Sequence, residues 1–172
     1  MLLTKNKNFI VADKDIHCIK LVRLSKENKR RTYKCPYTRK LIHDDVINGK
    51  ENMVAKGNAS SCEPTEYLVK LYPEYPFGFK EGLIHTYNFS ELEKFGDITG
   101  FALFECIIPK GTKYLSGINS LGRESYAAKE IKFIRKLKIK KKEPFVDPRD
   151  KRAFDSLSDD DKFVVEFLMM FF

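Results

Sequence analysis

The chain has no tryptophan and only four cysteines among its 172 residues. No two cysteines form a Cys-x-x-Cys pair and their spacing matches no zinc pattern, so a structural zinc module is not expected. The 14 phenylalanines and 8 tyrosines must then supply most of the large side chains of a core. We expect the cysteines to be free and mostly buried thiols, namely Cys18, Cys35, Cys62 and Cys106.

The motifs of common enzyme classes are also missing. The chain contains no phosphate-binding P-loop, no Rossmann glycine fingerprint and no Ser-His-Asp signature. Its three histidines, His17, His43 and His85, do not lie at a metal-ligand spacing. These absences favour a non-enzymatic protein with no metal and no cofactor.

Long apolar runs are absent as well. A membrane-spanning helix needs about twenty apolar residues, and the most apolar stretch, Phe163–Phe172, has ten. The start of the chain does not resemble a secretory leader, because Met1-Leu2-Leu3 is followed at once by Lys5 and Lys7. We therefore expect a cytoplasmic protein without a membrane span.

Acidic residues are fewer than basic ones. The chain has 32 lysines and arginines against 24 acidic residues, which gives a net charge of +8. A basic balance favours an anionic macromolecule as partner, either nucleic acid or an acidic protein. The alternative is that the charge serves only to keep the protein soluble.

The pattern of apolar residues predicts the fold. Short alternating or apolar runs, typical of strands, occur at 16–24, 31–37, 66–71, 101–108 and 131–140. The first two are expected to form an antiparallel hairpin. Ser90 and Glu93 form a capping-box pattern, which predicts one short helix over 90–95. We therefore predict an α+β domain with a twisted, mainly antiparallel sheet over residues 1–142.

The C-terminal residues are predicted to form a separate element. Two prolines in 143–157 indicate a linker, and Ser158 with the three aspartates that follow it favours a helix start. An apolar helix over 158–172 would pack on the domain or form a homo-oligomer through Phe163–Phe172.

The strand expected at 131–140 carries a row of lysines at alternate positions. Because side chains of a regular strand alternate between its faces, Lys132, Lys136, Lys138 and Lys140 should share one face. Such a face can neutralise phosphates and so bind an anionic partner. The alternative is an edge strand that its lysines protect from aggregation.

Two glutamates and one histidine are the candidate catalytic residues. Glu105 interrupts the apolar run 101–108, and a carboxylate forced into a core must be paired or have a raised pKa. Glu130 precedes the lysine row, and His85 lies next to the capped helix. The alternative is that Glu130 pairs with a lysine, Glu105 faces solvent and His85 is structural.

The order of several short blocks resembles that of small uncharacterised proteins of gut bacteria (Bacteroides-type) and their phages. These blocks are Lys20-Leu21-Val22-Arg23, Tyr37-Thr38, Gly82-Leu83-Ile84-His85-Thr86-Tyr87, Phe104-Glu105-Cys106 and Ile108-Pro109-Lys110-Gly111-Thr112. This resemblance implies an origin and no activity.

The C-terminal half of the domain is similar to the closing portion of ADP-ribosyltransferase folds. An apolar strand is followed there by the turn Pro109–Thr112, a loop and a strand that contains a glutamate. The resemblance implies NAD as cofactor, with Glu130 supporting the transfer. The family's paired acidic motif is not matched, because Ala128 stands two residues before Glu130. The leading prediction is therefore a basic, non-enzymatic binding or accessory protein, and the alternatives are an NAD-using transferase and an oligomeric structural protein.

Overall fold

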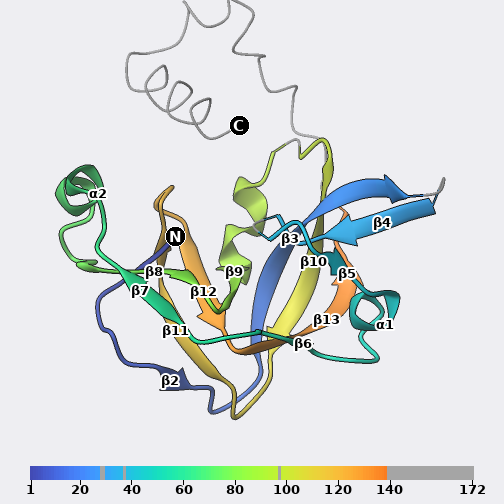
Figure 1. Ribbon diagram of the computed structural model, residues 1–172, viewed down its shortest axis with the longest axis horizontal. Helices are drawn as coiled ribbons and strands as arrows, with labels where there is room; N and C mark the ends of the chain where they lie inside the picture. The colour runs from blue at the N-terminus through green and yellow to red at the C-terminus, as the bar shows by residue number, and fades with distance from the viewer. Residues whose placement is uncertain (28–29, 37, 97, 139–172) are drawn as a thin grey trace, which may run out of the picture. The chain divides into compact units, whose positions relative to one another are not determined.

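A computed structural model describes residues 1–27, 30–36, 38–96 and 98–138, which form one compact unit (Figure 1). Its helices are α1 (Asp44–Ile47), α2 (Glu66–Leu71) and the 3-10 helix η1 (Phe89–Lys94). Its strands are β1 (Leu2–Thr4), β2 (Ile10–Val11), β3 (Ile16–Glu27), β4 (Arg30–Lys34), β5 (Leu41–Ile42), β6 (Met53–Val54), β7 (Ser60–Cys62), β8 (Phe77–Glu81), β9 (Ile84–Asn88), β10 (Phe101–Ile108), β11 (Lys113–Asn119), β12 (Glu124–Ala128) and β13 (Glu130–Lys136).

All the strands of this part of the chain belong to one antiparallel sheet. Its main path runs β6-β13-β10-β3-β9-β12-β11-β1-β8-β7, while β2 pairs with β11 and β4 joins β3 to β5. The sheet curls into a half-barrel, with strands making up 48% and helices 12% of the structure. The prediction of a mainly antiparallel sheet is therefore confirmed.

The α+β class, in contrast, is wrong. The two α-helices have four and six residues and the 3-10 helix has six, so none can form a layer over the sheet. The short helix predicted at 90–95 is this 3-10 turn, and the side chain of Asn88 rather than that of Ser90 caps it by accepting a hydrogen bond from the Ser90 amide.

Residues 139–172 lie outside the described part. The linker over 143–157, the apolar helix over 158–172 and the oligomer contact through Phe163–Phe172 therefore remain predictions. Within the described residues, no helix has the length and apolar content needed to cross a bilayer.

The long strand β3 holds the sheet together. It pairs with β10 over its first eight residues, from Ile16↔Ile108 to Arg23↔Phe101, and with β4 beyond that point. The run 101–108 is a strand as predicted, and so is the hairpin of β3 and β4. Both elements could be predicted from the sequence because apolar β-branched and aromatic residues alternate or follow one another in these segments.

Three local predictions fail for identifiable reasons. The run 66–71 is helix α2, whose start is capped by the Thr65 hydroxyl, which accepts a hydrogen bond from the Leu68 amide at 3.4 Å. The two glycines and the polar residues over 117–123 favour a loop, and 125–129 suits a helical turn, but these residues belong to the hairpin of β11 and β12. Gly117 lies inside β11, where the strand needs a residue without a side chain because a Cβ would be 1.8 Å from the Leu3 carbonyl oxygen.

The largest core cluster lies on one face of β3, β10 and β13. It includes Cys18, Val22, Phe104, Cys106 and Phe133, all of them buried. Aromatic rings meet edge to face within it, with the Phe104 and Phe133 centroids 5.4 Å apart. The four cysteines form no disulfide, and Cys18, Cys35 and Cys106 are buried as expected, whereas Cys62 is half-buried.

Candidate functional site

The predicted row of lysines does not share one face of a strand. Glu105 pairs with Arg135 and the next residue, Cys106, pairs with Phe133, so Ile134 is an extra residue in β13. A β-bulge of this kind changes which face the following side chains occupy. Lys132, before the bulge, pairs with Ile107, whereas Lys136, after it, pairs with Phe104 on the core side of the sheet.

The lysines of this row therefore have different surroundings. The Lys136 ammonium lies 6.0 Å from the centre of the Tyr33 ring, at the foot of the β3–β4 hairpin. Lys132 is exposed near the other end of β3, because its partner Ile107 pairs with His17. Lys138 is exposed beyond the end of β13, and Lys140 lies outside the described residues.

Glu105 is paired, which is one of the two outcomes expected for a carboxylate inside an apolar strand. Its side chain is 9% exposed and accepts hydrogen bonds from Arg135 at 2.6 Å and His17 at 3.0 Å. The Arg135 hydrogen bond is the largest cause that holds the pKa of this carboxyl below its usual value. Glu105 is thus a stable carboxylate, and not an acid with a raised pKa.

Glu130 has a different partner. It opens β13 opposite Val54, and its carboxylate accepts a hydrogen bond of 2.6 Å from the Asn52 side chain. The expected pairing with a lysine is not what this contact shows, because the donor is an uncharged amide. Glu130 therefore lies at the β13–β6 edge of the sheet.

His85 lies on β9, opposite Ala127 of β12, with Nε2 3.2 Å from the Lys80 carbonyl oxygen. Burial is the main cause that lowers its pKa to about 4, and the Lys20 ammonium adds to it. The ring is therefore neutral at physiological pH. Among the described contacts, none joins any two of Glu105, Glu130 and His85.

A buried lysine that the sequence interpretation missed lies beside His85. Lys20 of β3 is 2% exposed, and its ammonium donates a hydrogen bond of 2.7 Å to the His85 carbonyl. Pairing of β3 with β9 extends only over Cys18↔Asn88 and Ile19↔Tyr87, so β9 diverges from β3 at His85. The lysine takes the place of a strand partner there, and burial lowers its pKa.

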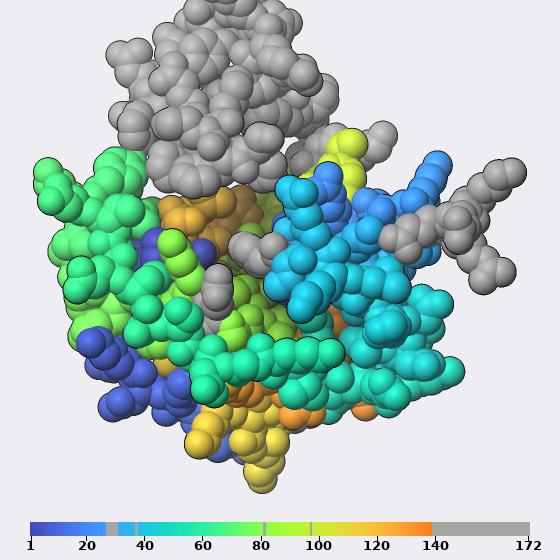
Figure 2. All heavy atoms as spheres, in the orientation of Figure 1, coloured from blue at the N-terminus to red at the C-terminus, as the bar shows by residue number. Residues whose placement is uncertain are grey.

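A second concentration of positive charge, besides the lysine-rich segment 132–142, is the hairpin of β3 and β4. Residues 23–34 hold six basic residues and one acidic residue, a net charge of +5 out of +8 for the whole chain. Beyond Leu24, whose amide donates to the Gly100 carbonyl, β3 pairs with β4 alone, and β4 pairs with β5 only at Tyr33 and Lys34. The tip of the hairpin therefore leaves the sheet as a two-stranded arm (Figure 1). Figure 2 shows the blue and light-blue atoms of these strands standing out at the right of this face. We call residues 23–34 the basic arm.

In the register of the basic arm, two charged pairs are like-charged and one, Glu27 with Arg30, is opposite in charge. Arg23 lies opposite Lys34, and Lys26 lies opposite Arg31. Because positions 23 and 26 of one strand are three residues apart, the two pairs lie on opposite faces of the arm. Like charges in direct cross-strand pairs destabilise a sheet by roughly 0.2–1 kcal/mol each. These basic residues are visible in the sequence, which predicted the hairpin of 16–24 and 31–37 but assigned the anion-binding face to 132–140 instead.

Comparison with protein-family models, with curated proteins and with solved structures found no significant match to this chain. Within the described residues, no three His, Cys, Asp or Glu side chains are grouped so that they would hold a metal ion. The basic arm is therefore the candidate site that rests on geometry and charge together.

Proposed function

We propose that this protein is a non-enzymatic nucleic-acid-binding protein whose basic arm contacts the phosphate backbone. The observation that carries the proposal is the concentration of basic residues on the arm, where the register places the exposed Lys26 directly opposite the exposed Arg31. Their repulsion costs stability in the free protein and is relieved when phosphates lie between or beside the side chains.

The shape of the arm favours a double helix over a single strand. Two paired strands are about 4.8 Å apart, and a two-stranded ribbon fits a major groove about 12 Å wide. With basic side chains on both faces, such a ribbon reaches the phosphates on both sides of a groove. Tyr33, the arm's aromatic residue, is half-buried against Phe104 at a centroid distance of 5.3 Å, so it is not placed for base stacking.

The test measures binding of a fluorescein-labelled 25-base-pair duplex by anisotropy at several salt concentrations. The double variant Lys26→Glu/Arg31→Glu is expected to bind more weakly, and the slope of log K against log salt should fall by about 1 for each phosphate that the arm no longer neutralises. The matched control is Lys14→Glu/Lys56→Glu, which changes the net charge equally at two exposed positions away from the arm. Equal weakening by both double variants would contradict the proposal.

Two further measurements locate and classify the site. Lys136→Glu, next to Tyr33, should weaken binding more than Lys132→Glu; equal effects would place binding along β13 rather than on the arm. Poly-glutamate of matched charge serves as a competitor. If it competes as well as unlabelled duplex does, the partner is an acidic protein surface and the nucleic-acid proposal fails.

A further inference from the structure

Polar side chains interrupt an otherwise apolar face of strands β11 and β12. Directly paired residues share a face, so Ser116 and Tyr126 lie on the same side as Ile118 and Glu124. Tyr126 packs against the largest core cluster, and Ile118 belongs to a second buried cluster. Ser116 and Glu124 lie between these two clusters and are exposed. This face of β11 and β12 is therefore exposed to solvent at Ser116 and Glu124.

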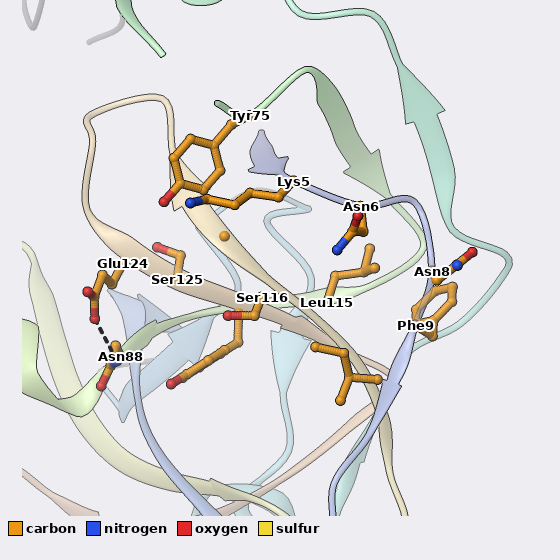
Figure 3. Close-up of a pocket in the computed structure, with 13 residues that line it drawn as sticks. Lys5, Asn6, Asn8, Phe9, Tyr75, Asn88, Leu115, Ser116, Glu124 and Ser125 are labelled. Carbon is orange, nitrogen blue, oxygen red and sulfur yellow. Dashed lines mark hydrogen bonds between the residues drawn. The ribbon is translucent and has the colours of Figure 1, made fainter. Parts of the chain in front are cut away.

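This part of the face is exposed because the N-terminal segment leaves the edge of β11. Strand β1 pairs with β11 as far as Leu3↔Ile118, and β2 resumes pairing at Ile10↔Tyr114. Between these points, residues 4–9 pass only three residues of β11, 115–117, so the segment stands away from the sheet. A cavity of about 600 Å³ lies there (Figure 3). This volume is within the usual range for small-molecule sites, about 300–1,000 Å³.

The charged groups of the cavity already have protein partners, an ion pair for Lys5 and an amide hydrogen bond for Glu124. The Lys5 ammonium lies 3.2 Å from the Glu74 carboxylate and 5.1 Å from the centre of the Tyr75 ring. The Glu124 carboxylate accepts a hydrogen bond of 2.8 Å from the Asn88 side chain. A ligand with a net charge would have to compete with these contacts, so an uncharged ligand is favoured.

The remaining lining groups combine hydrogen bonding with apolar surface. Figure 3 shows Asn6, Asn8 and Phe9 on one side of the cavity and Tyr75 above it. Asparagine amides both donate and accept, as sugar hydroxyls do. Phe9 and Ile10 are 36% and 47% exposed, and such surface suits the C–H face of a sugar ring.

We propose that this cavity binds a neutral saccharide of one or two sugar units. Glu124 and the asparagines accept from and donate to ring hydroxyls, while Tyr75 and Phe9 contact the apolar face of the ring. The site is on strands β11 and β12, and its existence does not depend on nucleic-acid binding by the basic arm.

The experiment is saturation-transfer NMR and titration calorimetry of the full chain against named neutral sugars. The panel is glucose, galactose, mannose, N-acetylglucosamine, maltose, cellobiose and lactose, with adenosine and uridine as uncharged ring compounds of another class. At least one sugar is expected to bind, and Ser116→Leu, which places a bulky side chain on the cavity floor, should abolish the signal. Lys113→Leu is the matched control, since it puts the same side chain at an exposed position of β11 that does not line the cavity.

Glu124→Gln tests the polar contact separately and is expected to weaken sugar binding about tenfold. Absence of binding by every sugar, binding by the nucleosides alone, or equal weakening in Ser116→Leu and Lys113→Leu would each overturn the proposal. Circular dichroism of each variant confirms that the absence of a signal comes from a folded protein.

Discussion

Lys132 and Lys136 lie on opposite faces of strand β13, although four residues of regular strand would place them on the same face. The extra residue, Ile134, is the cause, because Phe133 and Arg135 pair with the adjacent residues Cys106 and Glu105. The bulge puts Arg135 beside Glu105 and Lys136 beside the basic arm. A row of charges that looks continuous in the sequence is thereby divided between two sites.

A single substitution in the basic arm should change stability and duplex binding in opposite directions. Lys26→Glu replaces the repulsion with Arg31 by an attraction, so the free energy of unfolding should rise by about 0.5 kcal/mol, while duplex binding weakens. Urea denaturation and anisotropy measure the two effects. Lys26→Gln is the control, and it should weaken binding less and stabilise less. A Lys26→Glu variant that is less stable than the natural protein would contradict the described pairing.

The Glu105 ion pairs should make stability depend on acid. Because the folded-state pKa of this carboxyl is lowered, its contribution is present above the unfolded-state pKa and disappears as the pH falls through the folded-state value. Glu105→Gln is expected to cost about 1–2 kcal/mol at pH 7, and less at pH 3. Chemical denaturation at both pH values measures the difference. A cost that is equal at pH 7 and pH 3 would show that the charge of Glu105 has no role.

Lys20 should also make stability rise with pH, but in the alkaline rather than the acid range. Its pKa is lowered from 10.5 by burial, so the unfolded chain binds more protons and stability rises with pH up to about that value. Lys20→Met removes the charge, so its stability relative to the natural protein should be highest near neutral pH and decrease toward pH 10. Lys132→Met, at an exposed position, is the control. A stability difference that does not change with pH would argue against this account.

Gly117 should be intolerant of any side chain. A Cβ there would lie 1.8 Å from the Leu3 carbonyl oxygen, which is backbone and cannot move without breaking the β1–β11 pairing. Gly117→Ala is therefore expected to destabilise the protein by about 3 kcal/mol or more. Gly96→Ala is the control, because no atom lies within 4 Å of a Cβ at that position. Thermal unfolding of the two variants compares them, and equal melting temperatures would refute the clash.

The local elements were predictable where one pattern dominated. The run 101–108 is a strand over its full predicted length, because a continuous apolar run between turn residues has few alternatives. The run 66–71 was assigned wrongly, since six apolar and charged residues suit a strand or a helix equally. Thr65 decided the outcome by capping the helix.

The candidate site was predicted less well, and the reasons differ between residues. The charge of residues 23–34 was visible in the sequence. Its interpretation as a binding site depends on knowing that β3 extends beyond its pairing with β10 and continues as an arm. The partners of Glu105 come from two other strands, with His17 on β3 and Arg135 on β13. No spacing along the chain indicates such contacts.

Composition and alternation were sufficient for the antiparallel sheet, the basic character and the buried thiols, since these follow from which residues avoid water and which pairs repeat along a strand. Only the tertiary structure shows which face each charge occupies, where the arm leaves the sheet and where the gap beside β11 lies. Each depends on register between strands that are distant in sequence, where one extra residue such as Ile134 moves every following side chain to the other face.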